Sequence, residues 1–318
     1  MIAPADGTIV EVDDGIEDNS VGEVNTTKNW GNTIIIKHAE GLYSKLCHLQ
    51  KDSILVKPGD HVHYGQKIAK VGNSGRSPYP HLHFQIQSTP YIGSKTTRYP
   101  IFAFLENGKE IKTYSYPSSN QLVKSIEGDP LLSKAFNLTP GRRMNWRISS
   151  NKGVKSLTWE VFTNMYNKSY IFCHDTKSYA YFENDGAYFY FTHFEGNRNS
   201  LLYSFYLAAF RVPLVYVEGY LSVDYLPINK TFSGWRLFLH DFTAPFYVYL
   251  KTKIEVSTSR KGSQFDTDEI SCYSKLSGYS FNRLIGFRSF KMAIGKDGCI
   301  YFEDTNHATE ALCESFLH

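Results

Sequence analysis

The chain lacks several features that mark specialised classes of protein. Its five cysteines form no Cys-x-x-Cys pair, so neither a disulfide framework nor a cysteine-ligated zinc site is supported, and we expect mostly buried thiols. The net charge is +3, from 34 basic and 31 acidic residues. No cluster of Lys and Arg suits a phosphate backbone, and nucleic acid is therefore not an expected partner. The cysteines are Cys47, Cys173, Cys272, Cys299 and Cys313.

Long hydrophobic runs are also absent. The longest, Leu201 to Val217, contains Arg211 and Pro213 and is shorter than a membrane-spanning helix usually requires, so we predict an internal strand pair or helix. A signal peptide has a basic start followed by an apolar core, and the first residues do not show this pattern. Export is not explained by this chain, and we expect a membrane as a partner only through a possible segment upstream.

Strand-like runs fill the first ninety residues. They show β-branched or alternating apolar residues between Gly, Asn, Asp and Pro, and they predict an all-β domain over residues 1–90. Residues 91–121 predict a hairpin that turns at Asn107-Gly108, followed by a linker, PSSNQ, at 117–121. The predicted strands of the first domain are GTIVEV, NTIIIKH, YSKLCHL, SILV, QKIAKVG and HLHFQIQ.

Residues 122–318 predict a second domain rich in aromatic residues. A short helix is expected at DPLLSKAFN, with Asp129 as its cap and Pro130 at its first position. Two aromatic strands flank Asp185-Gly186, and MAIGKDGCIYFE repeats the pattern near the end. We predict a β-sandwich or barrel-like domain in which a binding cleft is possible, although core packing is the commoner role for any one of these rings.

The segment PYPHLHF, residues 78–84, places two histidines two positions apart. In an extended strand His81 and His83 point to the same face, roughly 6.5 to 7 Å apart. That spacing suits two imidazoles that converge on a metal ion or a metal-bound water. It also fits an exposed strand face, which is the commoner role of a His-x-His pair, and the pattern alone leaves both open. Pro80 is tolerated at the first position of a strand or on an edge.

Three segments in order resemble the zinc metallopeptidases of the M23 family, the lysostaphin-like cell-wall endopeptidases. They are APADGTIVEV, WGNTIIIKHAEGLYSKLCHL and VKPGDHVHYGQKIAKVGNSGRSPYPHLHF, and the resemblance covers about the first 90 residues. APADGTIVEV followed by VKPGDHVHYGQKI is also similar to biotinyl and lipoyl carrier domains. Those domains display a lysine, commonly beside methionine, at a turn between the two segments. No Met-Lys turn lies there, and the His-x-His strand has no explanation in a carrier.

The resemblance implies an M23-type antiparallel β-sheet domain with one Zn²⁺. It assigns His83 as a metal ligand, and His48 and His81 as catalytic groups that orient the water as base and donate to the oxyanion of the tetrahedral intermediate. His48 is expected to share the groove face with Leu46 and Ser44. The implied partner is a peptide of peptidoglycan, and the implied location is the cell envelope or the extracellular (periplasmic) space.

The sequence departs from the family pattern at the other two ligands. These come from a His-x-x-x-Asp motif on the strand before APADGT, whereas this chain begins at Met1, directly in front of that segment. The nearest acids, Asp13, Asp14, Glu17 and Asp18, match no ligand position, and we predict a solvated loop. Since one imidazole does not hold zinc at useful affinity, the chain as written is predicted to lack metallopeptidase activity.

Two explanations for the missing ligands stay open. In the preferred one, Met1 is internal to a longer zinc metalloendopeptidase that acts on peptidoglycan peptides, and this chain is N-terminally truncated. In the other, the domain is a degenerate relative that serves as a non-catalytic wall-binding or regulatory module. The first is preferred because a chain that had lost catalysis has no evident need to keep His48, His81 and His83.

Overall fold

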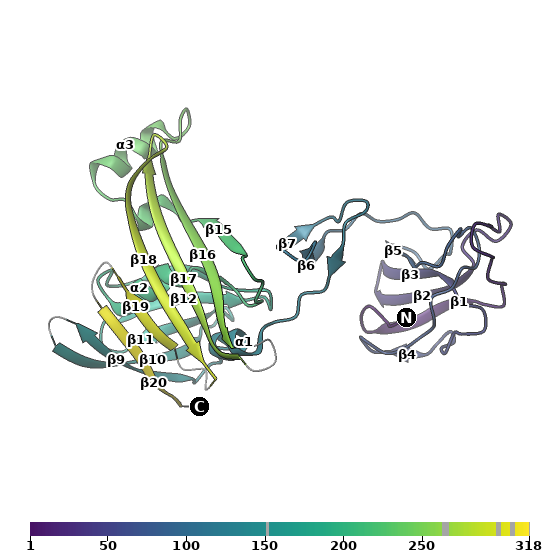
Figure 1. Cartoon of the computed structure of the whole chain (residues 1–318), viewed down its shortest axis with the longest axis horizontal. Coiled ribbons are helices and arrows are strands. Elements are labelled where there is room, and N and C mark those ends of the chain that lie inside the picture. The colour runs from purple at the N-terminus through teal and green to yellow at the C-terminus, as the bar shows by residue number, and fades with distance from the viewer. Residues whose placement is uncertain (151–152, 263–266, 297–299, 306–308, 318) are drawn as a thin grey trace. The chain divides into compact units, whose positions relative to one another are not determined.

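The chain forms two compact units of antiparallel β structure, Met1–Pro100 and Ile101–His318. The computed structural model describes residues 1–150, 153–262, 267–296, 300–305 and 309–317 (Figure 1). Strands outnumber helices in both units, and the paired strands run antiparallel. The predicted all-β fold class is confirmed.

The first unit is a five-stranded sheet with the order β4-β1-β2-β3-β5. Four of its strands, β1, β2, β3 and β5, lie where the sequence predicts them, although β5 begins two residues later than predicted. The predicted strands SILV and QKIAKVG are wrong. These segments form no regular strand, and isolated hydrogen bonds join them, such as that from the Leu55 N–H to the Ile68 carbonyl at 2.9 Å. The strands are β1 (Gly7–Asp13), β2 (Asn32–Ala39), β3 (Leu42–Leu49), β4 (His61–Val62) and β5 (His83–Gln87).

The two faces of this sheet differ in chemistry. One face carries the hydrophobic core, to which β2 and β3 contribute Ile34, Ile36 and Leu46. On the other face, Lys45 of β3 pairs with Gln85 of the edge strand β5. β5 is short and begins only at His83, so His81 lies in the loop before it. This loop brings His81 next to His48, which lies near the end of β3.

The second unit is built on a twelve-stranded sheet that nearly closes on itself. Its order is β14-β13-β12-β11-β10-β9-β20-β19-β18-β17-β16-β15. The two end strands meet through Arg211 of β14 and Asp224 of β15, whose Nη1 and Oδ2 atoms are 3.2 Å apart. The prediction of a sandwich or barrel-like domain is thereby resolved in favour of the barrel-like form. The strands are β9 (Arg143–Ser150), β10 (Gly153–Thr163), β11 (Ser169–Cys173), β12 (Ser178–Asn184), β13 (Tyr188–Glu195), β14 (Arg211–Pro213), β15 (Leu221–Tyr225), β16 (Leu250–Gly262), β17 (Thr267–Ser280), β18 (Arg283–Gly295), β19 (Ile300–Asp304) and β20 (Thr309–Leu317).

A buried helix fills the inside of this sheet. α2 (Leu201–Ala208) is apolar almost all round because it packs against β12, β13, β17 and β18, and the ring of Phe205 lies 5.9 Å from that of Trp146. The longest hydrophobic run of the sequence thus forms α2 and β14, an internal helix followed by a strand. Among the described residues, no helix is both long enough and apolar enough to span a bilayer.

Smaller elements of the second unit also follow their sequence signals. β6 (Ile101–Glu106) and β7 (Glu110–Ser115) form the predicted hairpin, in which Asn107 and Gly108 have φ of 50° and 70°. This hairpin and β8 (Val123–Lys124) make a three-stranded sheet. Asp129 caps α1 (Pro130–Phe136) by accepting the Leu131 N–H at 2.9 Å. The remaining helices are η1 (Ile228–Lys230) and α3 (Trp235–Thr243).

The cysteines are free and buried wherever the structure describes them. They are Cys47, Cys173, Cys272 and Cys313, as the sequence predicts. Burial raises the pKa of the Cys47 thiol to about 11, so this group is a protonated, unreactive part of the packing. Cys299 lies outside the described residues.

Candidate functional site

Three histidines from two stretches of the first unit lie together. The ring of His48, near the end of β3, is centred 4.9 Å from that of His81 and 5.9 Å from that of His83. Trp30 packs edge-on against His83, with ring centres 5.1 Å apart. The structure therefore brings together all three residues that the sequence singles out, at one edge of the sheet.

His48 reaches this cluster because the strand is irregular at that position. Its φ is +62°, and the register between β2 and β3 shifts next to it. The expectation that His48 shares a face with Leu46 and Ser44 is wrong, since Leu46 belongs to the core on the other face and Ser44 pairs with Ile36 of the same core. Strict alternation does not survive a bulge, which redirects the side chain.

The hydrogen bonds of His48 fix its tautomer. Its Nδ1 lies 2.8 Å from the carbonyl oxygen of Ser74, which accepts only, so Nδ1 carries the proton and Nε2 keeps a lone pair. The pKa of His48 is lowered chiefly by burial, and secondarily by the nearby His81 and His83, against the raising effect of the bond to Ser74. A neutral imidazole with a free Nε2 is suited to accept a proton or a hydrogen bond.

This lowered pKa predicts that acid destabilises the first unit. Below its ordinary pKa of about 6.5, His48 takes up a proton in the unfolded chain before it does so in the folded one. Stability is therefore full above that value and falls as the pH is lowered towards the folded-state pKa. Hydrogen exchange of the β2 amides at pH 7.5 and pH 5.5 measures the loss. His48→Asn, which does not titrate, should show a smaller loss, and an equal loss in both proteins would contradict this origin.

His81 is held by the loop that follows the NSG segment. Its Nδ1 lies 2.8 Å from the carbonyl oxygen of Tyr79 and 3.0 Å from the hydroxyl of Ser77. The hydroxyl of Ser77 is itself 2.8 Å from the amide oxygen of Asn73. Since the Tyr79 carbonyl only accepts, Nδ1 of His81 donates, and its Nε2 is the second free imidazole nitrogen of the cluster.

Two glutamines orient His83, and the sequence reasoning missed them. The amide nitrogen of Gln87 donates to carbonyl oxygens in the segment 89–91, and its oxygen accepts from the amide nitrogen of Gln85 at 2.8 Å. The amide oxygen of Gln85 is left to accept from Nε2 of His83 at 3.2 Å. Nδ1 of His83 therefore keeps its lone pair. The alternation in HFQIQ, which places these three side chains on one face, is the signal that predicts this series.

A buried lysine is the other residue that sequence reasoning missed. The Lys45 ammonium donates to the Ile92 carbonyl at 2.6 Å and lies 3.3 Å from the centre of the Trp30 ring. It makes no ion pair within the described part of the chain, and burial lowers its pKa. A cation over an aromatic face is stabilised by the ring quadrupole. Lys45 thus holds Trp30, and through it His83, against the sheet.

Two short segments of the M23-like pattern, WGN at 30–32 and GNSG at 72–75, contact each other beside His48. The backbone N–H of Asn32 donates to the Ser74 hydroxyl at 3.0 Å, and this hydroxyl donates to the Leu49 carbonyl at 2.7 Å. The His48 N–H in turn donates to the Trp30 carbonyl at 3.1 Å. These contacts set the position of Ser74, whose carbonyl fixes the imidazole of His48.

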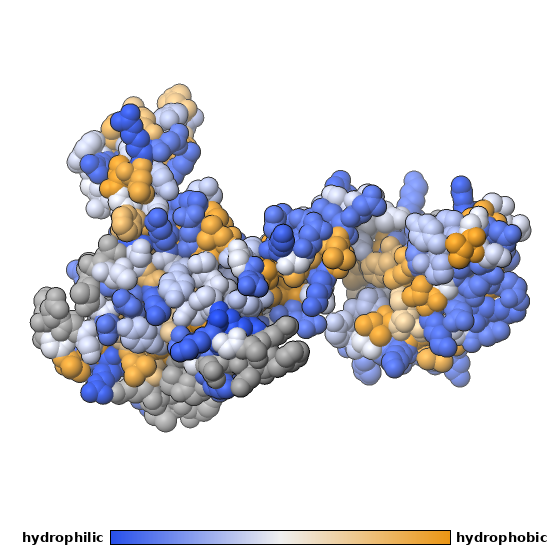
Figure 2. Space-filling view, viewed as in Figure 1, coloured by the Kyte–Doolittle hydropathy of each residue, from blue (hydrophilic) through white to orange (hydrophobic). Residues whose placement is uncertain are grey.

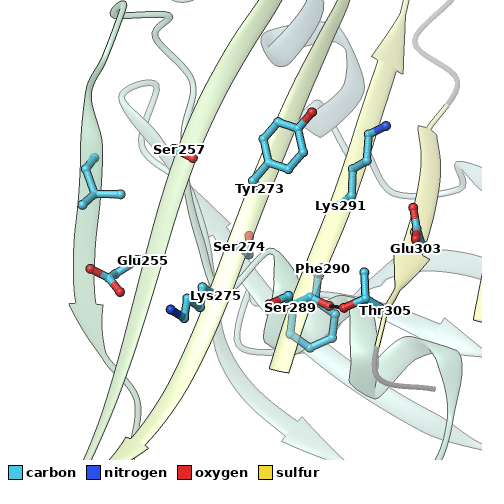
Figure 3. Close-up of a pocket in the computed structure, with 11 residues that line it drawn as sticks. Glu255, Ser257, Tyr273, Ser274, Lys275, Ser289, Phe290, Lys291, Glu303 and Thr305 are labelled. Carbon is cyan, nitrogen blue, oxygen red and sulfur yellow. Dashed lines mark hydrogen bonds between the residues drawn. The ribbon is translucent and has the colours of Figure 1, made fainter. Parts of the chain in front are cut away.

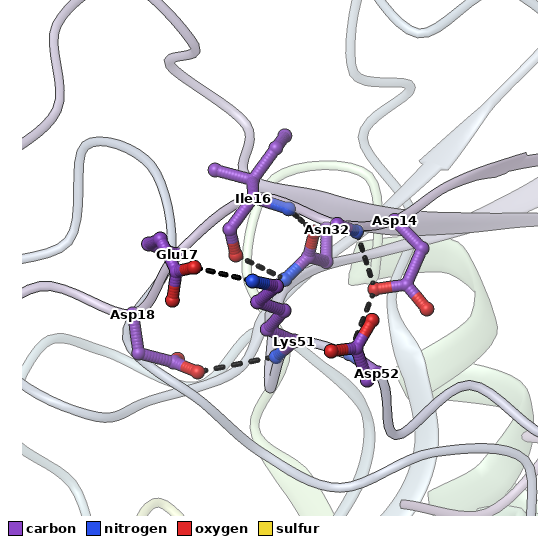
Figure 4. A network of polar contacts seen from close by, with 8 residues as sticks. Asp14, Ile16, Glu17, Asp18, Asn32, Lys51 and Asp52 are labelled. Carbon is purple, nitrogen blue, oxygen red and sulfur yellow. Dashed lines mark hydrogen bonds and ion pairs between the residues drawn. The ribbon is translucent and has the colours of Figure 1, made fainter.

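The acidic loop has a structural role as well as exposure to solvent (Figure 4). A carboxylate oxygen of Asp18 accepts the N–H of Lys51 at 3.1 Å, and one of Asp14 accepts the N–H of Asp52 at 3.1 Å. The ammonium of Lys51 pairs with Glu17. The prediction of a solvated loop is therefore incomplete, because these carboxylates also hold the turn that follows β3.

The histidine cluster does not form a metal site by itself. Within the described ranges, no three side chains of His, Cys, Asp or Glu are placed to hold a metal ion together. His48 and His81 each use Nδ1 on a carbonyl, and no carboxylate in the described part of the chain joins the three rings in a ligand set. The residues present therefore do not fit a resident zinc ion, which requires its ligand number and geometry together.

The second unit has a pocket on the outer face of β15 to β19 (Figure 3). Its volume is about 590 Å³. Tyr273 is one of its lining residues. Charged residues of opposite sign pair across adjacent strands: Glu255 opposite Lys275, and Lys291 opposite Glu303. Because these charges offset one another, the pocket has no net charge that selects an ion.

Comparison with known proteins decides the family of the first unit. Residues 1–95 match the model of peptidase family M23. The first unit is an M23 domain. The prediction from the sequence is confirmed, and the match ends within this unit.

The relatives of the M23 domain are larger proteins. Peptidoglycan DD-endopeptidase ShyA of Vibrio cholerae is 37% identical over 90 residues, which are 27% of this chain and 20% of ShyA. Murein hydrolase activator NlpD of Escherichia coli is 37% identical over 87 residues, 27% of this chain and 19% of NlpD. The chain thus matches about a fifth of each. The catalytic domain of the prophage-encoded M23 protein EnpA from Enterococcus faecalis is 26% identical over 30% of this chain and 64% of its own, with a TM-score of 0.23.

Proposed function

We propose that the M23 domain of this chain acts on the peptides of bacterial peptidoglycan, in the cell envelope or outside the cell. The observation that supports this most is the convergence of His48, His81 and His83 at one edge of an M23 sheet. ShyA, a similar protein, is named a peptidoglycan DD-endopeptidase. Chemistry on such peptides requires groups that exchange hydrogen bonds and protons with an amide bond, and imidazole nitrogens do both.

The three histidines have different proposed roles. His83, with its free Nδ1, stands at the position of a metal ligand in the family pattern. His48 and His81 present free Nε2 atoms that suit proton transfer or hydrogen bonding at the substrate. Because the residues present do not fit a zinc ion, we assign no hydrolytic step to this chain alone. Peptidase activity is proposed only for a form in which a His-x-x-x-Asp strand completes the ligand set.

A non-catalytic role is the second candidate. The described residues contain no group placed to hold a metal, and NlpD, which is as similar to this chain as ShyA is, is named a murein hydrolase activator. The same edge of the sheet would then hold peptidoglycan peptide without cutting it, or the domain would regulate another hydrolase. In this candidate the ligand is still a peptide of peptidoglycan, but the M23 domain does not hydrolyse it.

Zinc content and release of peptide from purified peptidoglycan test the proposal. The 318-residue chain is expected to hold less than one zinc, to release no peptide, and to sediment with peptidoglycan. His81→Ala with His83→Ala should abolish cutting in a form that carries the remaining ligands but spare pure binding. His63→Ala, an exposed histidine in the β4 turn, is the matched control.

Reading the in-frame codons upstream of Met1 shows whether a form with the remaining ligands is encoded. If such a form holds zinc but leaves the wall uncut, the peptidase role is rejected and the binding role is kept. If neither the 318-residue chain nor the form with the remaining ligands sediments with peptidoglycan, both roles are rejected.

A further inference from the structure

The helix α3 in the second unit turns its apolar side to solvent. Trp235, Phe238, Leu239 and Phe242 follow the i, i+3, i+4, i+7 spacing of one helical face. Their exposed fractions are 71%, 78%, 43% and 74%. A surface helix usually packs such a stripe against the core of its own domain, so this orientation is unusual.

Polar contacts on the opposite side of α3 fix this orientation. His240 is buried, and its Nδ1 accepts the backbone N–H of Leu250 at 3.2 Å. The hydroxyl of Tyr249 donates to the carbonyl of Arg236 at 2.7 Å, and its ring lies 5.0 Å from that of His240. The helix is therefore attached to β16 through these contacts, and its apolar stripe cannot turn inwards without breaking them.

Neighbouring segments extend the exposed apolar surface. The ring of Phe281, in the turn between β17 and β18, stacks on Tyr249 with centres 4.9 Å apart. A cleft of about 230 Å³ lies between α3 and this turn. We call the whole surface the apolar tip, and Figure 2 shows hydrophobic residues, in orange, among hydrophilic ones at this end of the second unit. Its members are Trp235, Phe238, Leu239, Phe242, Phe246, Tyr247, Val248, Phe281, Leu284, Ile285 and Phe287.

The apolar tip is too large to be an ordinary part of a soluble surface. Single exposed apolar side chains are common, but these eleven are each at least 43% exposed, and Phe246 reaches 90%. Large contiguous apolar patches mark contact with a protein, a ligand or a membrane. The tip lies on α3 and on the far turns of β16 to β18 (Figure 1), so it projects from the sheet and does not line a deep groove.

The charges around the tip select among these partners. Residues 235–251 and 281–288 contain Arg236, Lys251, Arg283 and Arg288 against the single acid Asp241. Arg288 is neutralised by an ion pair with Asp304, which leaves three basic groups and one acidic group. Basic residues around a face of Trp, Phe and Leu characterise helices that lie in a membrane interface and bind anionic lipids.

We propose that the apolar tip inserts into the surface of an anionic lipid bilayer, with α3 lying in the plane of the interface. Trp235 and Tyr247 belong to the residue types enriched at the boundary of headgroups and hydrocarbon, and Phe238, Phe242 and Phe246 supply the area buried in the acyl region. This contact differs from the expectation that a membrane is reached only through an upstream segment. It is independent of the chemistry proposed for the M23 domain.

Sedimentation of the 318-residue chain with lipid vesicles tests this proposal. Vesicles of phosphatidylcholine mixed with phosphatidylglycerol are expected to bind the chain more tightly than phosphatidylcholine alone, and added salt should weaken the difference. Phe238→Ser with Phe242→Ser should bind at least about tenfold more weakly, because two exposed rings lose their apolar transfer free energy. Tyr166→Ser, at an aromatic residue 75% exposed in the turn after β10, should bind like the unchanged chain.

Two further measurements separate the possible outcomes. Arg236→Gln with Arg283→Gln should lose the preference for anionic vesicles, and vesicles should protect Trp235 from an aqueous fluorescence quencher. The proposal is overturned if the chain stays in the supernatant with both vesicle types, or if the Phe238, Phe242 variant binds like Tyr166→Ser. If the chain does not bind vesicles, but is a dimer that becomes a monomer in the Phe238→Ser, Phe242→Ser variant, the membrane proposal is rejected and the tip is a contact between two copies of the chain.

Discussion

Gly31→Ala is expected to destabilise the M23 domain by about 2–5 kcal/mol. Gly31 has φ of +61°, and a Cβ added there would lie 2.4 Å from both the carbonyl and the hydroxyl oxygen of Ser74. The left-handed conformation costs a non-glycine residue about 1–2 kcal/mol, and overlap with backbone adds about 1–3 kcal/mol or more. Ser74 cannot retreat freely, because its hydroxyl bonds the Leu49 carbonyl and its carbonyl holds His48.

Hydrogen exchange of the β2 amides in the full chain measures this loss. Gly41→Ala is the matched control, since Gly41 also has a positive φ, +69°, but a Cβ there meets nothing within 4 Å. It should cost only about 1–2 kcal/mol. Equal losses in the two variants would show that the contact between Gly31 and Ser74 contributes nothing beyond the conformation of the glycine.

Much of the M23 site is predictable from the sequence because its position depends on local pattern. The strands β1, β2 and β3 lie between turn residues, and His83 begins β5 on an edge. The orientation of His48 is not predictable in this way. It depends on a positive φ at a bulge, and a non-glycine residue gives no sign of that conformation in sequence. The same is true of Lys45, whose burial depends on Trp30 and on a later loop.

The second unit shows a different limit of structure prediction from the sequence. Hairpins such as β12–β13 can be predicted, because each depends on neighbouring strands and on Asp185-Gly186. The order of the sheet cannot, because β9 pairs with the last strand, β20, as well as with β10. Pairing between the two ends of a domain leaves no mark in local periodicity. The spacing of Trp235, Phe238 and Phe242 is visible in the sequence, but it predicts a face turned inwards, and only the structure shows it turned outwards.

A buried ion pair lies between α1 and β16 in the second unit. Asp129 and Arg260 are paired, and their side chains are only 6% and 13% exposed. The guanidinium of Arg260 also lies 4.2 Å from the centre of the Tyr216 ring. Asp129 has a second role, since its other oxygen caps α1 by accepting the N–H groups of Leu131 and Leu132. One carboxylate therefore attaches α1 to β16.

Asp129→Ala is expected to lower the free energy of unfolding of this unit by about 4–6 kcal/mol. Removing one partner of a buried pair costs about 3–5 kcal/mol because the other charge stays buried, and loss of the cap adds about 1 kcal/mol. Urea denaturation followed by tryptophan fluorescence measures the change.

Asp129→Asn separates the two roles, because it keeps an oxygen for the cap and loses only the charge. Adding Arg260→Met to Asp129→Asn removes the unpaired cation and should recover part of the loss, a coupling that a double-mutant cycle quantifies. If the double variant is no more stable than Asp129→Asn, burial of the guanidinium is not the source of the cost. The stability that Asp129 supplies would then come from the cap, and the attachment of α1 to β16 would rest on apolar packing.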